Sequence, residues 1–433
     1  MTDMAASNHQ TANTVDWHSP AQKAHTKRRY RAERRLKIYG LAAIWIALGL
    51  LTILVTSLVQ SGYPAFTQTH ISLAVDISPK YVKADDIRGG NYRSIVRNGL
   101  FAQLPEVTNR RDRRQVSKIL SRTAENQVRQ AVVQDPDLIG QTVAFAFPAS
   151  DPLDQFNKGV IPRDIPENQR RASDVQIKAF DALDEKGLVS RDFNTGLFTN
   201  ADSRFPEVAG LAGAIMGSFY ALLVCFLISF PVGIASAVYL EEFAPKNRWT
   251  DLIEVNINNL AAVPSVVFGL LALAVFLNFM GMPRSAPLVG GMTLSLMTLP
   301  TIIITTRASL KAVPPSIREA ALGVGASKFQ VMLHHVLPLA MPGILTGTII
   351  GLAQALGETA PLLLIGMNAF ITSLSGGIMD PATALPTQVF IWADSPERGF
   401  VSRTSAGILV LLGFLILMNG LAIFMRKKFE RRW

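Results

Sequence analysis

Long apolar runs without charge constrain the fold of this chain more than any other feature. A helix needs roughly 20 apolar residues to cross a hydrocarbon core of roughly 30 Å, and soluble domains rarely contain such runs. With 49% hydrophobic and 17% charged residues, the 433 residues predict an all-α polytopic membrane protein rather than two or three soluble domains. We expect six transmembrane helices, near residues 38–59, 208–240, 260–282, 288–306, 341–365 and 406–425.

Basic residues lie at both ends of the chain, whose net charge is +10. They crowd positions 27–37, before the first apolar run, and positions 426–432, after the last. The positive-inside rule therefore predicts that both termini are cytoplasmic in a bacterial inner membrane. Residues 1–37 would form a cytoplasmic tail, disordered up to about residue 24. The same placement of charge argues against nucleic acid binding.

Residues 60–206 have the composition of a soluble domain, with charges of both signs and no run that could span a bilayer. Because this segment follows the first crossing, we expect it to be a small periplasmic α+β domain inserted into the membrane protein. No catalytic constellation stands out among its acidic residues. The residue patterns predict strands at 71–77 and 142–147, helices at 91–104, 113–133 and 168–183, and a hairpin at 193–198.

The remaining segment, 207–433, is expected to form a core of five transmembrane helices with a cytoplasmic loop at 307–340. The single cysteine, Cys225, lies inside the second span, so an intrachain disulfide and a thiolate metal site are excluded, and we interpret it as a packing residue. The same span has small residues near one face, a pattern that permits close helix packing: Gly210, Gly213 and Gly217.

The loop at 307–340 has the pattern of two short helices. Gly325 suits the left-handed residue that ends the first helix, and Pro338 is expected to limit the second. From these residues alone, a solvated hairpin and a docking element for another protein are both open interpretations. His334 and His335 are adjacent, so their side chains diverge and no metal site is expected there. Two pairs have capping-box spacing: Ser316 with Glu319, and Ser327 with Gln330.

The same loop resembles the EAA loop of ABC importer permeases. The resemblance implies a type I ABC permease whose loop seats on a separate ATPase subunit and transmits its closure. This chain has no Gly-x-x-x-x-Gly-Lys-Ser/Thr sequence, so we expect ATP and Mg²⁺ on that ATPase and no cofactor on this chain. His335 stands where an aliphatic residue is usual. The residues that carry the resemblance, and to which it assigns ATPase coupling, are Glu319, Ala320, Ala321, Gly325, Leu337 and Pro338.

An acidic residue, Glu358, lies within the fifth apolar run. A charge there costs roughly 2.5–3.5 kcal/mol, so its side chain should face the bundle interior, a partner or a water path. We interpret Glu358, with Thr359 and Pro361, as part of a translocation pathway or its gate, and a structural ion pair with a partner subunit is the alternative. A carboxylate is a poor direct ligand for an oxyanion, because only a protonated hydroxyl of the anion could donate to it.

Residues 355–361 resemble a segment of phosphate-specific ABC permeases, as do 263–270 and 385–393. Many relatives carry an Arg near the position of Gln354, so the group that would balance Glu358 here is open. The resemblance begins near Gly217 and runs to the C-terminus. It implies an importer of inorganic phosphate in which this chain, a transport subunit and not an enzyme, works with a second permease subunit, an ATPase dimer and a periplasmic phosphate-binding protein.

Other functions fit parts of the same pattern. Another oxyanion, such as sulfate or molybdate, is the nearest alternative cargo. A membrane sensor would explain a folded domain after one anchor, but it predicts a large cytoplasmic signalling domain, whereas only a short tail follows the last apolar run. A secondary transporter would need no ATPase and usually shows internal repeats, which we do not find in this sequence.

Overall fold

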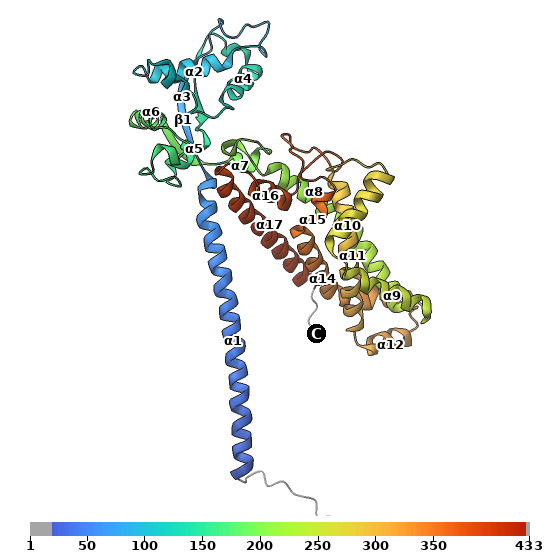
Figure 1. The fold of residues 1–433 in the computed structure, drawn as a ribbon. Coiled ribbons are helices and arrows are strands. Elements are labelled where there is room, and N and C mark those ends of the chain that lie inside the picture. Colours follow the sequence, from blue (N-terminus) through green and yellow to red (C-terminus); the bar gives the residue numbers. More distant parts are fainter. Residues whose placement is uncertain (1–19, 430–433) are drawn as a thin grey trace, which may run out of the picture. The chain divides into compact units, whose positions relative to one another are not determined.

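The computed structural model describes residues 20–429 and divides the chain into two units, 1–57 and 58–433 (Figure 1). The predicted disorder of residues 1–19, and the basic residues Arg431 and Arg432, lie outside the described residues.

Helix α1 (Pro20–Gly62) contains the described part of the first unit and is longer than the predicted span at 38–59. The prediction of disorder is wrong for residues 20–24, which are helical. Ala, Lys and Arg are good helix formers, and the ion pair between Lys37 Nζ and Glu33 Oε1, at 2.6 Å, joins successive turns. The apolar side chains of the span are exposed within this chain, as expected for a helix that meets lipid or a partner.

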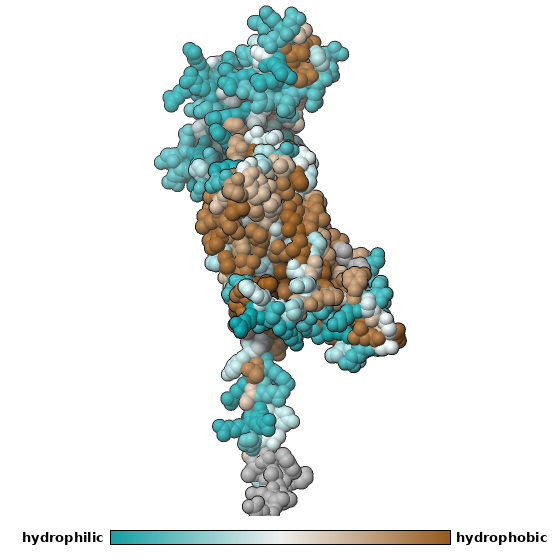
Figure 2. Space-filling model, turned by 90° about the vertical axis from the view of Figure 1, so that its right-hand side faces the viewer, coloured by the Kyte–Doolittle hydropathy of each residue, from teal (hydrophilic) through white to brown (hydrophobic). Residues whose placement is uncertain are grey.

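Four helices of the second unit are long and apolar enough to cross a membrane, which makes five with α1 among the described residues. Figure 2 shows hydrophobic side chains gathered in a band over this helical core, with hydrophilic side chains above and below the band. The four spans are α8 (Ala212–Val238), which continues in a π turn to Phe243; α11 (Pro287–Lys311); the segment Lys328–Gly357, which contains α13 (Lys328–Val331) and α14 (Leu337–Gly357); and α17 (Gly399–Phe429).

The third predicted span, 260–282, is not one continuous helix. It is broken between α9 (Arg248–Ala261) and α10 (Ser265–Ala272), whose axes differ by 102°. The break has a local cause, because Pro264 lacks a backbone N–H and disfavours helical geometry at Val263. Helix α9 begins between the second and third predicted spans, where the Asn247 side chain caps it by accepting from Trp249 N at 3.1 Å.

The close approach of α8 and α11 depends on glycine, though not on the glycines predicted. A Cβ atom on Gly291 of α11 would lie 2.5 Å from the carbonyl oxygen of Ala221 on α8. Gly217 instead packs against a loop, since its Cβ would lie 2.0 Å from Thr383 O, and Gly210 precedes α8. The interpretation of Cys225 as a packing residue is confirmed, because its side chain is fully buried between these two helices and lies 3.4 Å from Thr298 Oγ1.

The inserted segment forms an α+β fold around a three-stranded antiparallel sheet of order β2–β1–β3, which confirms both predicted strands. Leu73 pairs with Phe145 and Ile71 with Val189. The helices bury their apolar sides on this sheet in one hydrophobic cluster. The elements are β1 (Thr67–Asp76), α2 (Tyr92–Gln103), α3 (Arg110–Val116), α4 (Ala124–Gln134), β2 (Thr142–Pro148), α5 (Asp151–Asn157), α6 (Asp174–Glu185) and β3 (Val189–Phe193).

Three local predictions in this fold are wrong in part. The helix predicted at 113–133 is two helices, α3 and α4, separated by the turn at 117–123. The helix predicted from residue 168 begins at Asp174, where Ser173 and Gln176 form a capping box. The predicted hairpin at 193–198 is the end of β3 followed by the short helix α7 (Gly196–Thr199).

Candidate functional site

Of the two short helices predicted between α11 and α14, the first is found as a separate helix. Helix α12 (Pro315–Gly323) ends at a turn in which Gly325 has φ +89°, as predicted for a left-handed residue. The second predicted capping box is also present: Gln330 N donates to Ser327 Oγ at 3.3 Å and Ser327 N donates to Gln330 Oε1 at 2.9 Å.

Two details of the loop differ from the prediction. Ser316 and Glu319 form no capping box, because α12 begins two residues earlier than that box requires, with Pro314 at its N-cap position. Pro338 does not end the second helix. It lies at the start of α14, where the first turn tolerates proline, and Lys328–Gly357 is one candidate span of 30 residues. The second half of the loop is therefore continuous with a membrane-length helix.

The loop exposes apolar side chains next to a charged residue. Ala321 is buried against Val331 and Met332, which fixes α12 to the segment that follows it. Glu319 and Ala320 are exposed, and Val324 and Phe329 expose 86% and 62% of their surface. Such exposed apolar side chains beside a charged residue are typical of a surface that another protein covers.

Ion pairs connect this loop to two other helices, and sequence analysis did not predict them. Arg318 of α12 contacts Glu242, at the end of α8, with Nη2–Oε1 2.9 Å. Arg307 of α11 contacts Glu241 at 3.3 Å and Glu254 of α9 at 2.6 Å. In the sequence, the basic residues of this region indicated only on which side of the membrane it lies. The two acidic partners of Arg307 are 53 and 66 residues away along the chain, so no local pattern could predict these ion pairs.

Glu358 lies at a helix break and not within a continuous helix, so the predicted span at 341–365 is corrected. Helix α14 ends at Gly357, Glu358 is extended (φ −74°, ψ 123°), and α15 (Ala360–Leu364) follows. The cause is Pro361, whose ring would clash with the carbonyl of Gly357 in an unbroken helix. Glu358 and Thr359 are half-buried, and Pro361 is buried.

The structure brings two of the three phosphate-permease-like segments into contact. A Cβ on Gly269 of α10 would lie 2.7 Å from Pro361 Cα, so the segment 263–270 packs closely on the Glu358 break. The third segment forms a helix, α16 (Leu385–Ala393), whose first turn is fixed by Thr387 Oγ1 donating to Met367 O at 2.7 Å. The residues predicted to couple to an ATPase lie in a separate place, on α12, at the turn after it and at the opposite end of α14 from Glu358.

Gln388 of α16 is a further polar residue of this region that sequence analysis did not single out. Its side chain is fully buried, and neither Oε1 nor Nε2 has a hydrogen-bond partner among the described residues. A buried amide without a partner in the described part of the chain costs free energy that an apolar side chain would not.

We expect Gln388→Met to raise the thermal midpoint of the purified protein. The reason is that an unpaired buried amide is replaced by an apolar side chain of similar volume. Thermal unfolding measures the effect. Leu385→Met, a volume-conserving change on the same helix, is the control, and a lowered midpoint for Gln388→Met would contradict the prediction.

The helical core, its coupling loop and the helix break define a permease of the binding-protein-dependent ABC importer class. Residues 229–433 match the family described as binding-protein-dependent transport system inner membrane component, and residues 23–167 match a domain of unknown function, DUF3333. The phosphate transport system permease protein PstA of Haemophilus influenzae is 30% identical over 237 residues, covering 54% of this chain and 81% of that protein.

Two further PstA proteins show similar likeness. That of Yersinia pestis is 35% identical over 221 residues, covering 51% of this chain and 74% of the relative. That of Xylella fastidiosa strain Temecula1 is 32% identical over 249 residues, covering 57% and 85%. This chain belongs to the PstA family of permease subunits, and the predicted resemblance to phosphate-specific permeases is confirmed.

Proposed function

We propose that this chain is a permease subunit of an ATP-driven importer that moves inorganic phosphate across the bacterial inner membrane. The observation that carries the proposal is the continuity of Lys328–Gly357, which joins the exposed coupling loop to the break at Glu358. The likeness to phosphate permeases named PstA supports phosphate as the cargo. In this arrangement both termini and the coupling loop face the cytoplasm, and the inserted domain at 60–206 faces the periplasm.

The partners proposed follow from this role. A PstB-like ATPase dimer binds ATP and Mg²⁺ and contacts the surface formed by Glu319, Val324 and Phe329. A PstC-like permease subunit supplies the other half of the pathway, and a PstS-like periplasmic protein delivers phosphate. No cofactor is assigned to this chain.

The proposed cycle transmits force along packed helices. Closure of the ATPase moves α12, and its buried residue Ala321 carries α13 and α14 with it. The ion pair between Arg318 and Glu242 moves the end of α8 in the same step. Leu337 and Pro338 belong to the helix that moves, and the motion reaches the break at Glu358, Thr359 and Pro361.

Glu358 is proposed as a gate residue and not as a phosphate ligand. Its carboxylate repels a phosphate dianion, and only a protonated phosphate hydroxyl can donate to it. A charge at a helix break is well placed to hold the pathway closed to anions until the helices move.

Glu358→Gln is expected to slow phosphate uptake by about tenfold or more, equivalent to about 1.4 kcal/mol on the barrier, while the ATPase still copurifies. The reason is that a neutral amide no longer holds the gate closed to anions, so phosphate leaks back and net uptake falls, while the coupling loop is unchanged. Uptake in vesicles and copurification measure the two quantities. Asp394→Asn, an exposed substitution after α16, is the control, and unchanged uptake kinetics for Glu358→Gln would reduce Glu358 to a structural role.

The proposed function is tested by reconstituting this chain with its three partners in vesicles that contain ATP. We expect uptake of labelled phosphate that depends on ATP and on the binding protein, and that excess sulfate or molybdate does not reduce. Preferential uptake of sulfate or molybdate would show that phosphate is not the transported ion, but the chain would still belong to an ATP-driven importer. Uptake without ATP hydrolysis would contradict the assignment to an ATP-driven importer.

A further inference from the structure

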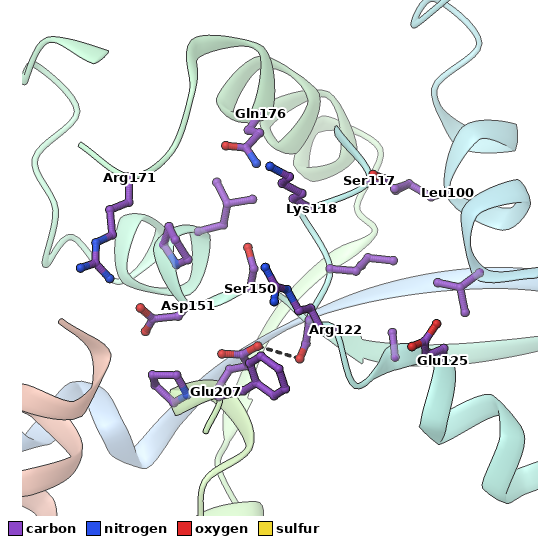
Figure 3. Close-up of a pocket in the computed structure, with 18 of the residues that line it drawn as sticks. Leu100, Ser117, Lys118, Arg122, Glu125, Ser150, Asp151, Arg171, Gln176 and Glu207 are labelled. Carbon is purple, nitrogen blue, oxygen red and sulfur yellow. Dashed lines mark hydrogen bonds between the residues drawn. The ribbon is translucent and has the colours of Figure 1, made fainter. Parts of the chain in front are cut away.

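The inserted domain contains a large open cavity that the proposed transport cycle does not use. Its volume is about 930 Å³, and its walls come from α2, the turn before α4, the start of α5 and the segment 204–207 (Figure 3). Protein cavities that bind small molecules have volumes of roughly 300–1,000 Å³. The cavity therefore has the size of a ligand site.

Positive charge dominates the lining of this cavity. Arg93 forms an ion pair with Glu125, Nε–Oε2 3.0 Å. Among the residues that the structure describes, the other five cations have no carboxylate oxygen within 4.0 Å of their nitrogen atoms. The six lining cations are Arg93, Arg97, Lys118, Arg122, Arg171 and Arg204.

The lining also contains four acidic residues, fewer than its six cations: Glu125, Asp151, Glu207 and Glu397. Asp151 and Glu207 lie close together in Figure 3, where Glu207 is buried and Asp151 is half-buried. Burial raises the pKa of both carboxyl groups, which favours their neutral, protonated forms. Asp151 also accepts a hydrogen bond from Gln155 Nε2 at 2.7 Å, and Glu207 accepts one from Ser121 Oγ at 2.7 Å.

The arrangement of the cations indicates the kind of anion. Arg97 lies on α2, Lys118 and Arg122 lie in the turn before α4, and Arg171 precedes α6, so the lining receives cations from separate elements. A single phosphate is much smaller than 930 Å³, whereas an anion with several phosphoryl groups can contact cations from more than one of these elements. Arginine forks bind phosphoryl oxygens in pairs, and Ser150 adds a hydroxyl donor to the lining.

We propose that this cavity is a binding site for an anion that carries two or more phosphoryl groups. The site lies in the part of the chain that matches the domain of unknown function, and it is distinct from the helix break at Glu358. This inference rests on the cavity and its unpaired cations and is independent of the ion that the permease transports.

The test measures binding of tripolyphosphate to the full chain in nanodiscs of neutral lipid, by isothermal titration calorimetry at constant ionic strength. We expect saturable binding at one site, at least about tenfold tighter than binding of inorganic phosphate or sulfate. The double variant Arg97→Gln with Lys118→Gln should bind at least about tenfold more weakly, because two charge-assisted contacts are lost.

A matched control removes the same charge from a neighbouring surface. Arg111→Gln with Arg114→Gln changes two exposed residues of α3 that lie outside the cavity lining, and it should bind as the unmodified chain does. Thermal midpoints confirm that both double variants are folded. Absence of saturable tripolyphosphate binding, or equal loss in both double variants, would overturn the site.

Discussion

Glu319→Lys is expected to abolish ATP-driven phosphate uptake while the protein still inserts in the membrane. Glu319 is exposed on α12 beside the apolar side chains of the coupling loop, so its reversal changes the contact surface and not the packing within the chain. Reversing a charge in a protein contact costs roughly 2–5 kcal/mol, which weakens ATPase association by about 30-fold or more. Copurification of the ATPase and uptake of labelled phosphate measure the effect.

The control for this prediction is Glu106→Lys, which reverses an exposed charge in the inserted domain. It should leave ATPase copurification unchanged. Normal uptake and normal copurification by Glu319→Lys would remove the docking role of the loop, and a protein absent from the membrane fraction would show instead that Glu319 is needed for folding.

Arg403→Leu is expected to destabilise the junction between the inserted domain and the core. Arg403, in the first turns of α17, is 3% exposed and donates to Ala209 O at 2.7 Å and to Glu207 O at 3.2 Å. It also lies close enough to Asp151 to oppose the rise that burial causes in the pKa of that carboxyl. Removing one member of a buried charge cluster typically costs about 3–5 kcal/mol, because the remaining polar groups are left without a partner.

The expected result is a thermal midpoint lowered by on the order of 10 °C and faster proteolysis near residues 199–209. Arg403→Lys should show a smaller loss, since a single ammonium cannot reproduce the two-pronged contact of the guanidinium. Arg398→Leu, an exposed change just before α17, is the control. A midpoint for Arg403→Leu equal to that of Arg398→Leu would contradict the role of Arg403.

The sequence predicted the parts of this fold that depend on local patterns. Hydropathy located the spans, because a helix that crosses the bilayer needs a contiguous run of apolar residues. Alternation located β1 and β2, and the turn geometry of Gly325 and the capping box at Ser327 followed from single residues and short spacings. The resemblance to phosphate permeases supplied the class of function.

The sequence predictions were wrong where a proline breaks an apolar helix, and they missed contacts between residues far apart in the sequence. Pro264 and Pro361 break helices that the apolar runs predicted as continuous, and Pro315 shifts the start of α12 so that Ser316 cannot cap it. The contact of Arg403 with Ala209 joins residues 194 positions apart, and no local pattern predicts it. The unpartnered amide of Gln388 likewise becomes visible only in the packed structure.

The continuity of Lys328–Gly357 has a geometric consequence for gating. Its 30 residues make a rod about 45 Å long. If the proposed ATPase tilts this rod by about 5° about the end at Lys328, simple leverage displaces the other end, beside Glu358, by about 4 Å. A shift of that size exceeds the diameter of a water molecule, so under the proposed function a small rotation at the loop end is enough to admit or exclude solvent beside Glu358.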